Sequence, residues 1–150
     1  MTNLKEALFQ QCVAHVNTRL QTIQTIISSH QKALSSETKS SAGDKHETGR
    51  AMLQLEMEKA GQQLASVKQM QQTLAMVAIT KSSTSVRLGT IIETSSIHYF
   101  LSVSAGKLTV NEITYFAISA SSPIGQLLVG KQAGDTFHWN GKELKINNVL

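Results

Sequence analysis

Two segments of the chain carry apolar residues at spacings that alternate between three and four. The spaced positions of the first segment are Phe9, Val13, Val16, Leu20, Ile23, Ile27, His30 and Leu34. Those of the second segment are Leu53, Met57, Ala60, Leu64, Val67, Gln71, Leu74 and Ala78. This alternation is the a/d pattern of a coiled coil, repeated for about four heptads in each segment. It predicts one helix over residues 3–35 and a second helix from Asp44 to about Ile79.

The two patterns are mirror images of each other. Pairing Leu34 with Leu53, and each earlier position with the corresponding later one, keeps the sum of the two residue numbers constant. An antiparallel hairpin requires this relation, whereas one continuous rod does not. The sequence therefore predicts that residues 1–79 form an antiparallel coiled-coil hairpin with its tip at residues 36–47. Each arm of about 30 residues would reach roughly 45 Å at ~1.5 Å per residue.

The predicted tip is small and polar, and it contains two acids, Asp44 and Glu47. Their spacing fits a capping box, in which Asp44 caps the second helix and Glu47 reaches back to the first backbone amide. Residues three apart also lie on one face of a helix, so two carboxylates at an exposed end can point at one cation. The two carboxylates can cap the helix, bind a cation, or do both, so neither interpretation excludes the other.

The apolar period changes from the heptad to two after residues 80–85, which form a polar linker of sequence TKSSTS. Alternating β-branched and aromatic residues then predict strands. The expected strands cover residues 86–93, 97–103, 108–110, 115–119, 136–139 and 142–149. Asn140-Gly141 is a strong signal for a two-residue hairpin turn. Residues 86–150 are therefore predicted to form a small α+β domain with a mostly antiparallel sheet.

A short helix is expected inside this domain. Ser122 is suited to be its N-cap and Pro123 its first residue, while Gly130 is suited to end it. Its predicted buried face consists of Ile124, Leu127 and Leu128.

Composition narrows the class of protein. The chain has 150 residues, enough for one domain or two small ones, and a net charge of +4, which is no strong nucleic-acid footprint. A single cysteine, Cys12, excludes an internal disulfide and fits a reducing cytoplasm. We interpret it as a small apolar residue beside the seam. The N-terminal residues do not read as a signal peptide, and no apolar run approaches the ~18 residues of a membrane span.

The residues that carry chemistry in enzymes are scattered. The histidines are His15, His30, His46, His98 and His138. None has ligand spacing to another histidine or to Cys12, and His30 is interpreted as a polar residue that sets the register of the coiled coil. With no nucleophile–base pair, phosphate loop or complete metal set, an enzyme that acts alone is not expected.

Several motifs resemble those of the Gre family of bacterial transcript cleavage factors. At the predicted tip, Gly43-Asp44-Lys45-His46-Glu47 is similar to the family's Gly-Asp-x-x-Glu motif. Residues 119–149 are similar to the family's C-terminal signature. The pieces that carry this second resemblance are Ser122-Pro123, Leu127-Leu128-Val129-Gly130-Lys131 and Gly134-Asp135, followed by the closing hairpin. The resemblance covers nearly the whole chain in order.

The resemblance implies an FKBP-like C-terminal domain, without prolyl-isomerase activity, that docks at the rim of the secondary channel of RNA polymerase. It implies that the hairpin enters this channel, where Asp44 and Glu47 help the polymerase's own active site to hold a second Mg²⁺ and to cut the 3′ end of backtracked RNA. The protein alone would bind no cofactor, and we expect a cytoplasmic monomer. The residues implied to shape the contact with the polymerase are Ser122, Pro123, Gly130, Lys131, Gly134 and Asp135.

The tip also departs from the family pattern. Cleavage factors usually carry Asn, Ala, an acid and an aromatic residue after the glutamate, where this chain has Thr48, Gly49, Arg50 and Ala51. Arg50 thus places a cation where the family carries an acid. A cation near a helix N-terminus also opposes the macrodipole. Three functions therefore stay open: a cleavage-stimulating elongation factor, a Gre-like regulator that occupies the channel without stimulating cleavage, and a coiled-coil interaction module unrelated to transcription.

Overall fold

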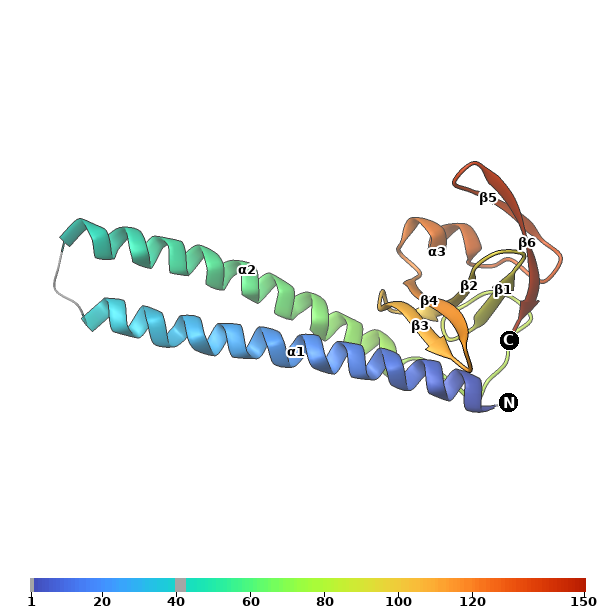
Figure 1. The fold of residues 1–150 in the computed structure, drawn as a ribbon, viewed down its shortest axis with the longest axis horizontal. Coiled ribbons are helices and arrows are strands. Elements are labelled where there is room, and N and C mark those ends of the chain that lie inside the picture. The colour runs from blue at the N-terminus through green and yellow to red at the C-terminus, as the bar shows by residue number, and fades with distance from the viewer. Residues whose placement is uncertain (1, 40–42) are drawn as a thin grey trace. The chain divides into compact units, whose positions relative to one another are not determined.

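The computed structural model describes the backbone of residues 2–39 and 43–150 and the side chains of residues 4–36 and 48–150. The helices are α1 (Thr2–Lys39), α2 (Gly43–Ala75) and α3 (Pro123–Leu128) (Figure 1). The strands are β1 (Ile91–Thr94), β2 (His98–Ser102), β3 (Gly106–Val110), β4 (Ile113–Ser119), β5 (Thr136–Trp139) and β6 (Lys142–Val149). The predicted α+β class, a helical hairpin followed by a sheet, is confirmed.

The chain forms two compact units. The hairpin unit is Val16–Met70, and the sheet unit combines Met1–His15 with Gln71–Leu150. The sheet unit is thus discontinuous in sequence, because the first turns of α1 belong to it. The predicted division into residues 1–79, a linker at 80–85 and a domain at 86–150 stays an expectation about independent folding.

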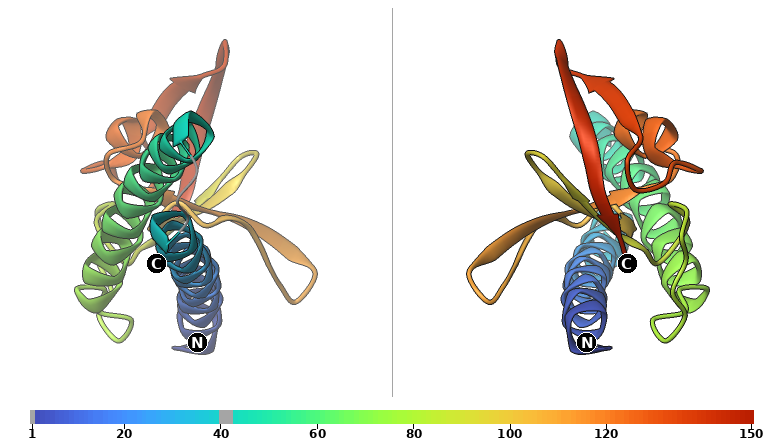
Figure 2. Two further views of the ribbon diagram at one scale, coloured as in Figure 1. Left: turned by 90° about the vertical axis from the view of Figure 1, so that its left-hand side faces the viewer. Right: turned by 90° about the vertical axis from the view of Figure 1, so that its right-hand side faces the viewer.

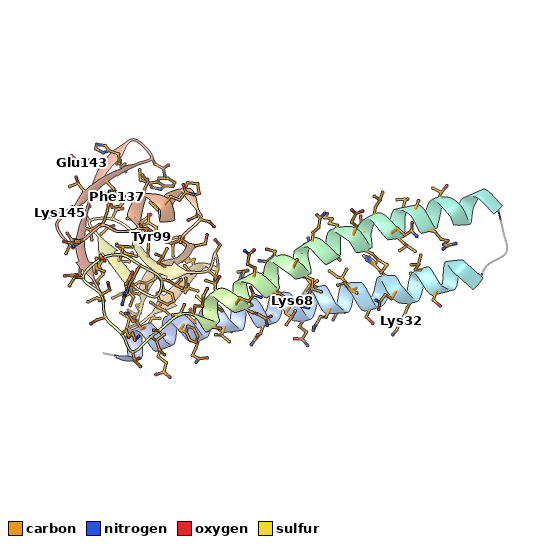
Figure 3. All side chains as sticks on the ribbon, turned by 180° about the vertical axis from the view of Figure 1, so that it is seen from behind. Lys32, Lys68, Tyr99, Phe137, Glu143 and Lys145 are labelled. Carbon is orange, nitrogen blue, oxygen red and sulfur yellow. The ribbon has the colours of Figure 1, made fainter. Side chains whose placement is uncertain are left out.

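The hairpin unit buries the predicted seam. Val16, Ile23, Ala60 and Val67 are buried, and the remaining seam positions between residues 16 and 70 are half-buried, while most other side chains of the two helices are exposed. The arms run side by side in opposite directions, with Lys32 and Lys68 at their surface (Figures 1 and 3). Among the described side chains, Arg19 Nη1 of the first arm contacts Met70 Sδ of the second at 3.4 Å.

The ends of the long helices differ from the prediction. The first helix continues past residue 35 to Lys39, and the second begins at Gly43, so the connection between them is shorter than expected. Residues 40–42 lie outside the described residues. The second helix ends at Ala75 rather than near Ile79. Its end is closed by tighter bonds, in which the Met76 and Val77 amides donate to carbonyls three residues earlier, and such bonds satisfy the last carbonyls of a helix.

The sheet has six strands in the order β3-β4-β2-β1-β6-β5. The pair β2–β4 is parallel, and the other neighbouring pairs are antiparallel. The last strand, β6, pairs with β1 through its second half and with β5 through its first half (Figure 2). The sheet is therefore mixed.

Two tight turns, each with two residues of positive φ, connect neighbouring strands of the sheet. Asn140 and Gly141 have φ of 53° and 76° and join Trp139 to Lys142, as their dipeptide predicts. Between β3 and β4, Asn111 and Glu112 also have positive φ, 51° and 66°. That second turn was not predicted, since glutamate rarely adopts this conformation.

The predicted first strand, residues 86–93, is wrong in its first half, because β1 begins only at Ile91. Residues 87–90 form a turn. The Thr90 hydroxyl donates to the Arg87 carbonyl at 2.7 Å and accepts from its amide at 3.2 Å, and Gly89 has a φ of 91°. Val86 is bonded instead to the residues after α3: its amide donates to the Lys131 carbonyl.

The sheet is covered on both faces. On one face, α3 closes a core that includes Ile92, Tyr99, Leu101 and Phe137 (Figure 3). Side chains alternate between faces along a strand, so Ser102 points to the face opposite Leu101. There the buried Cys12 of α1 places its Sγ 3.5 Å from Ser102 Oγ.

Cys12 is fully buried in this interface. Burial raises the pKa of its thiol, and the hydrogen bond with Ser102 opposes that shift only in part. A thiol with a raised pKa is a weak nucleophile, so the interpretation as a small apolar packing residue fits the structure. The Gln11 side chain adds a bond to the Thr109 carbonyl at 2.9 Å.

The buried face predicted for the short helix is correct at two positions and wrong at the third. Ile124 and Leu128 are buried, but Leu127 is 38% exposed. We expect Leu128→Ala to lower the free energy of unfolding by ~2–5 kcal/mol, because it removes a fully buried side chain. Leu127→Ala is the matched control and should cost less than ~1 kcal/mol. Urea denaturation of the two variants measures the difference, and equal losses would contradict the burial described here.

Candidate functional sites

The acidic pair lies at the beginning of the second arm of the hairpin. Since α2 begins at Gly43, Asp44 is its second residue and Glu47 its fifth. Their side chains lie outside the described residues. The first turn of a helix carries amide groups without intrahelical partners and the positive end of the macrodipole, so carboxylates are favoured there. The backbone therefore places both acids at the end of the hairpin, three residues apart on one helix.

The chemistry of this pair fits a shared metal site better than a complete one. Carboxylate oxygens are the hard ligands that Mg²⁺ prefers, but Mg²⁺ takes six ligands and commonly keeps waters and phosphate oxygens among them. Among the described side chains, no cluster of three or more His, Cys, Asp or Glu is suited to hold a metal ion. Asp44 and Glu47 would thus contribute two ligands to an ion whose other ligands come from elsewhere.

The residues that follow the pair are accessible. Thr48 and Arg50 are exposed, and so are the large apolar side chains of Met52 and Leu55. The guanidinium of Arg50 therefore lies at the surface of the hairpin, three residues after Glu47.

Ser122 and Pro123 begin α3. The Ser122 hydroxyl accepts from the Gly125 amide at 3.1 Å and donates to the Ser119 carbonyl at 2.7 Å, so this side chain is an N-cap that also ties α3 to the end of β4. Pro123 occupies the first turn, as predicted, and its ring is exposed.

Gly130 and Lys131 end the helix. Gly130 has a φ of 86°, a conformation that favours glycine. Its amide donates to the Val86 carbonyl at 2.9 Å, and the Lys131 amide donates to the Leu128 carbonyl at 3.0 Å. These two residues therefore join the end of α3 to the segment that precedes β1.

Gly134 and Asp135 form the turn before β5. Gly134 has a φ of 94° and donates its amide to the Ile146 carbonyl at 2.8 Å. Asp135 Oδ2 accepts from the Gln132 amide at 2.8 Å, which closes the turn. Each of the six predicted contact residues thus has a role in shaping α3 and the loops beside it.

The structure adds two residues to this candidate surface. Leu127 and Val129 are 38% and 47% exposed and flank the buried Leu128. The apolar pattern of the sequence placed Leu127 in the core, and Val129 was named only within the motif that carries the family resemblance. A helix of six residues has too few turns for the apolar pattern to separate its two faces, so that pattern marked neither residue as exposed. Together with Pro123, they make α3 the apolar part of an otherwise polar loop region.

These features define an α+β protein in which a helical hairpin with an acidic pair at its end is combined with a six-stranded mixed sheet. The chain is similar to a solved structure of the transcription factor Gfh1, with 16% identity, a TM-score of 0.35, and coverage of 95% of this chain and 93% of that chain. No protein-family model matches the sequence, and no curated protein matches it. In the described part of the chain, no helix has the length and apolar character needed to cross a membrane.

Proposed function

We propose that this protein is a Gre-like transcription elongation factor that binds RNA polymerase at its secondary channel and stimulates cleavage of backtracked RNA by the polymerase's own active site. The observation that carries the proposal is the position of the motif Gly43-Asp44-x-x-Glu47 at the start of α2, where the hairpin turns. The hairpin unit extends ~35–40 Å at ~1.5 Å per residue. An acidic pair presented on such an arm can reach a centre deep inside a partner.

The chain's own contribution is to deliver two carboxylates. Asp44 and Glu47 would hold a Mg²⁺ ion jointly with the polymerase, and such an ion activates water and stabilises an in-line displacement at phosphorus. The buried seam holds the two helices of the hairpin together, so the pair is carried at the end of a packed arm. The loops around α3 would dock on the polymerase. On this proposal the protein is not itself an enzyme.

One observation favours a second candidate, a channel-binding regulator that does not stimulate cleavage. Lys45 lies between the two acids, and the exposed Arg50 follows them. Cations so close to the pair reduce the affinity of the site for Mg²⁺ by direct repulsion. A protein that fills the channel without completing the metal site would block substrate access and inhibit synthesis.

The experiment that separates these functions uses stalled, backtracked elongation complexes with radiolabelled RNA. On addition of the full-length protein and Mg²⁺, a cleavage factor shortens the transcripts from the 3′ end. A non-cleaving regulator leaves them intact but competes with a known secondary-channel ligand and slows elongation. Absence of binding to polymerase at low salt would contradict both.

Docking through the α3 region leads to a separate prediction. We expect Leu127→Glu to weaken binding to polymerase by ~10-fold or more, because the substitution would bury an unpaired carboxylate in the proposed interface. Ile113→Glu is the matched control, since Ile113 is 46% exposed on β4 and lies outside the α3 loops. Competition binding measures both variants. Equal weakening by the two would place the interface elsewhere.

A further inference from the structure

A pocket of about 340 Å³ lies within the sheet unit, beside the first turn of α1. Its apolar wall is formed by Leu4, Ile79, Ile91 and Leu150, which come from four separate parts of the sequence. The start of α1 and the end of the chain lie close together in this unit (Figures 1 and 2). The volume is at the lower end of the range for small-molecule sites, ~300–1,000 Å³.

One charged side chain lines the pocket and is almost completely buried. Lys5 is only 7% exposed, and its Nζ donates one hydrogen bond, to the Lys81 carbonyl at 2.8 Å. An ammonium group has three N–H donors, so this single bond leaves two of them without a hydrogen bond to the described residues. Glu6, the adjacent acid, is exposed. Among the described residues, no carboxylate forms an ion pair with Lys5.

The charges near Lys5 make an anion favourable there. Burial, and then the positive charge of Arg87, lower the pKa of Lys5 below its ordinary value of 10.5. Lys81 adds a second cationic side chain to the lining. Buried charges in proteins are normally paired, because an isolated one loses its hydration without compensation. A bound anion would give Lys5 Nζ the ion-pair partner that no described carboxylate provides.

We propose that this pocket binds a medium-chain monocarboxylate, with its carboxylate on Lys5 Nζ and its alkyl chain against Leu4, Ile79 and Ile91. The charge complementarity selects the head group, and the apolar wall selects the tail. A bound molecule would connect the start of α1 to the segment that follows α2, so it would stabilise the sheet unit. This inference does not depend on the proposed role in transcription.

Calorimetric titration of the full-length protein with octanoate tests the proposal. We expect saturable binding of one octanoate per chain, and a rise in the thermal midpoint that grows with octanoate concentration. Octanamide keeps the tail without the charge, and acetate keeps the charge without the tail. Both should bind at least ~10-fold more weakly, a difference of ~1.4 kcal/mol. Lack of octanoate binding, or equal binding of octanamide, overturns the proposal.

Variants locate the site. Lys5→Met should weaken octanoate binding at least ~10-fold, whereas Lys107→Met, at an exposed lysine of β3, should leave it unchanged. If Lys5→Met does not fold, Thr80→Trp tests the same pocket, because Thr80 lines it and is exposed. Thr84→Trp is its control at an exposed position outside the lining. Unchanged octanoate affinity in a folded Lys5→Met, or in Thr80→Trp, overturns the assignment.

Discussion

Replacing Gly125 with alanine is expected to destabilise the sheet unit by at least ~3 kcal/mol, at the upper end of the range for overpacked sites. A Cβ atom at this position would lie 2.0 Å from the Ser119 carbonyl oxygen and 2.9 Å from Ser122 Oγ. Those two atoms are themselves hydrogen-bonded at 2.7 Å, so neither can move without breaking the N-cap of α3. Relief therefore requires α3 to shift away from the end of β4, which uncovers Leu128.

Gly61 provides the matched control for this substitution. It lies in the interior of α2, and a Cβ there would have no neighbour within 4 Å. Gly61→Ala should therefore raise the free energy of unfolding by ~0.5–1 kcal/mol through helix propensity alone. Urea unfolding of both variants, followed by circular dichroism, gives the two differences. If Gly125→Ala unfolds at the wild-type midpoint, the contact between α3 and β4 is looser than described.

Substituting Asp44→Asn and Glu47→Gln is expected to abolish stimulation of transcript cleavage while leaving the thermal midpoint nearly unchanged. Asparagine caps a helix about as well as aspartate, and glutamine also completes a capping box, so any structural role survives in both variants. Neither amide carries the anionic charge that a Mg²⁺ ligand supplies. The two interpretations of the pair therefore separate in one experiment, in which cleavage of stalled complexes and thermal unfolding are measured on the same samples.

Glu56→Gln is the control for the loss of negative charge, since Glu56 is exposed on α2 nine residues beyond Glu47. It should retain wild-type stimulation. Full activity in both tip variants would show that the pair is only structural. If wild type itself gives no stimulation but competes for the channel, Lys45 and Arg50 have disabled the tip, and the non-cleaving regulator is the better interpretation.

The hairpin could be predicted from the sequence because heptad spacing maps directly onto one face of a helix. The buried residues Val16, Ile23, Ala60 and Val67 all belong to the predicted seam. The burial of each of these residues follows from the heptad pattern of its own helix, which repeats over several helical turns. The turn at Asn140-Gly141 was predictable for a similar reason, since it depends only on the backbone conformations that two adjacent residues can adopt.

The first turns of α1 could not be predicted in this way. There the fully buried residues are Leu8 and Cys12, one position before the seam residues Phe9 and Val13, which are half-buried. All four are apolar, so the local pattern cannot choose between the two faces. The choice is made by the sheet, through contacts such as that of Cys12 with Ser102, 90 residues away.

The candidate sites show the same limit. The acidic pair was found from a short motif and its place at a predicted bend. Leu127 was assigned to the core by its apolar character, yet it is exposed, because the six residues of α3 bury only Ile124, Gly125 and Leu128. Nothing in the sequence around Lys5 marks it as buried, since its surroundings are assembled from residues more than 70 positions further along the chain.

The discontinuity of the sheet unit also sets the order in which the protein assembles on the ribosome. Lys5, Cys12 and Gln11 contact residues that follow them by 76, 90 and 98 positions. At ~5–20 residues per second, the partner of Gln11 is synthesised on the order of 5–20 s after Gln11 itself. The two helices that form the hairpin seam are both synthesised much sooner. In the nascent chain, the two helices of the hairpin unit can therefore pack along their seam first. Leu8 and Cys12 stay exposed until the sheet has been synthesised.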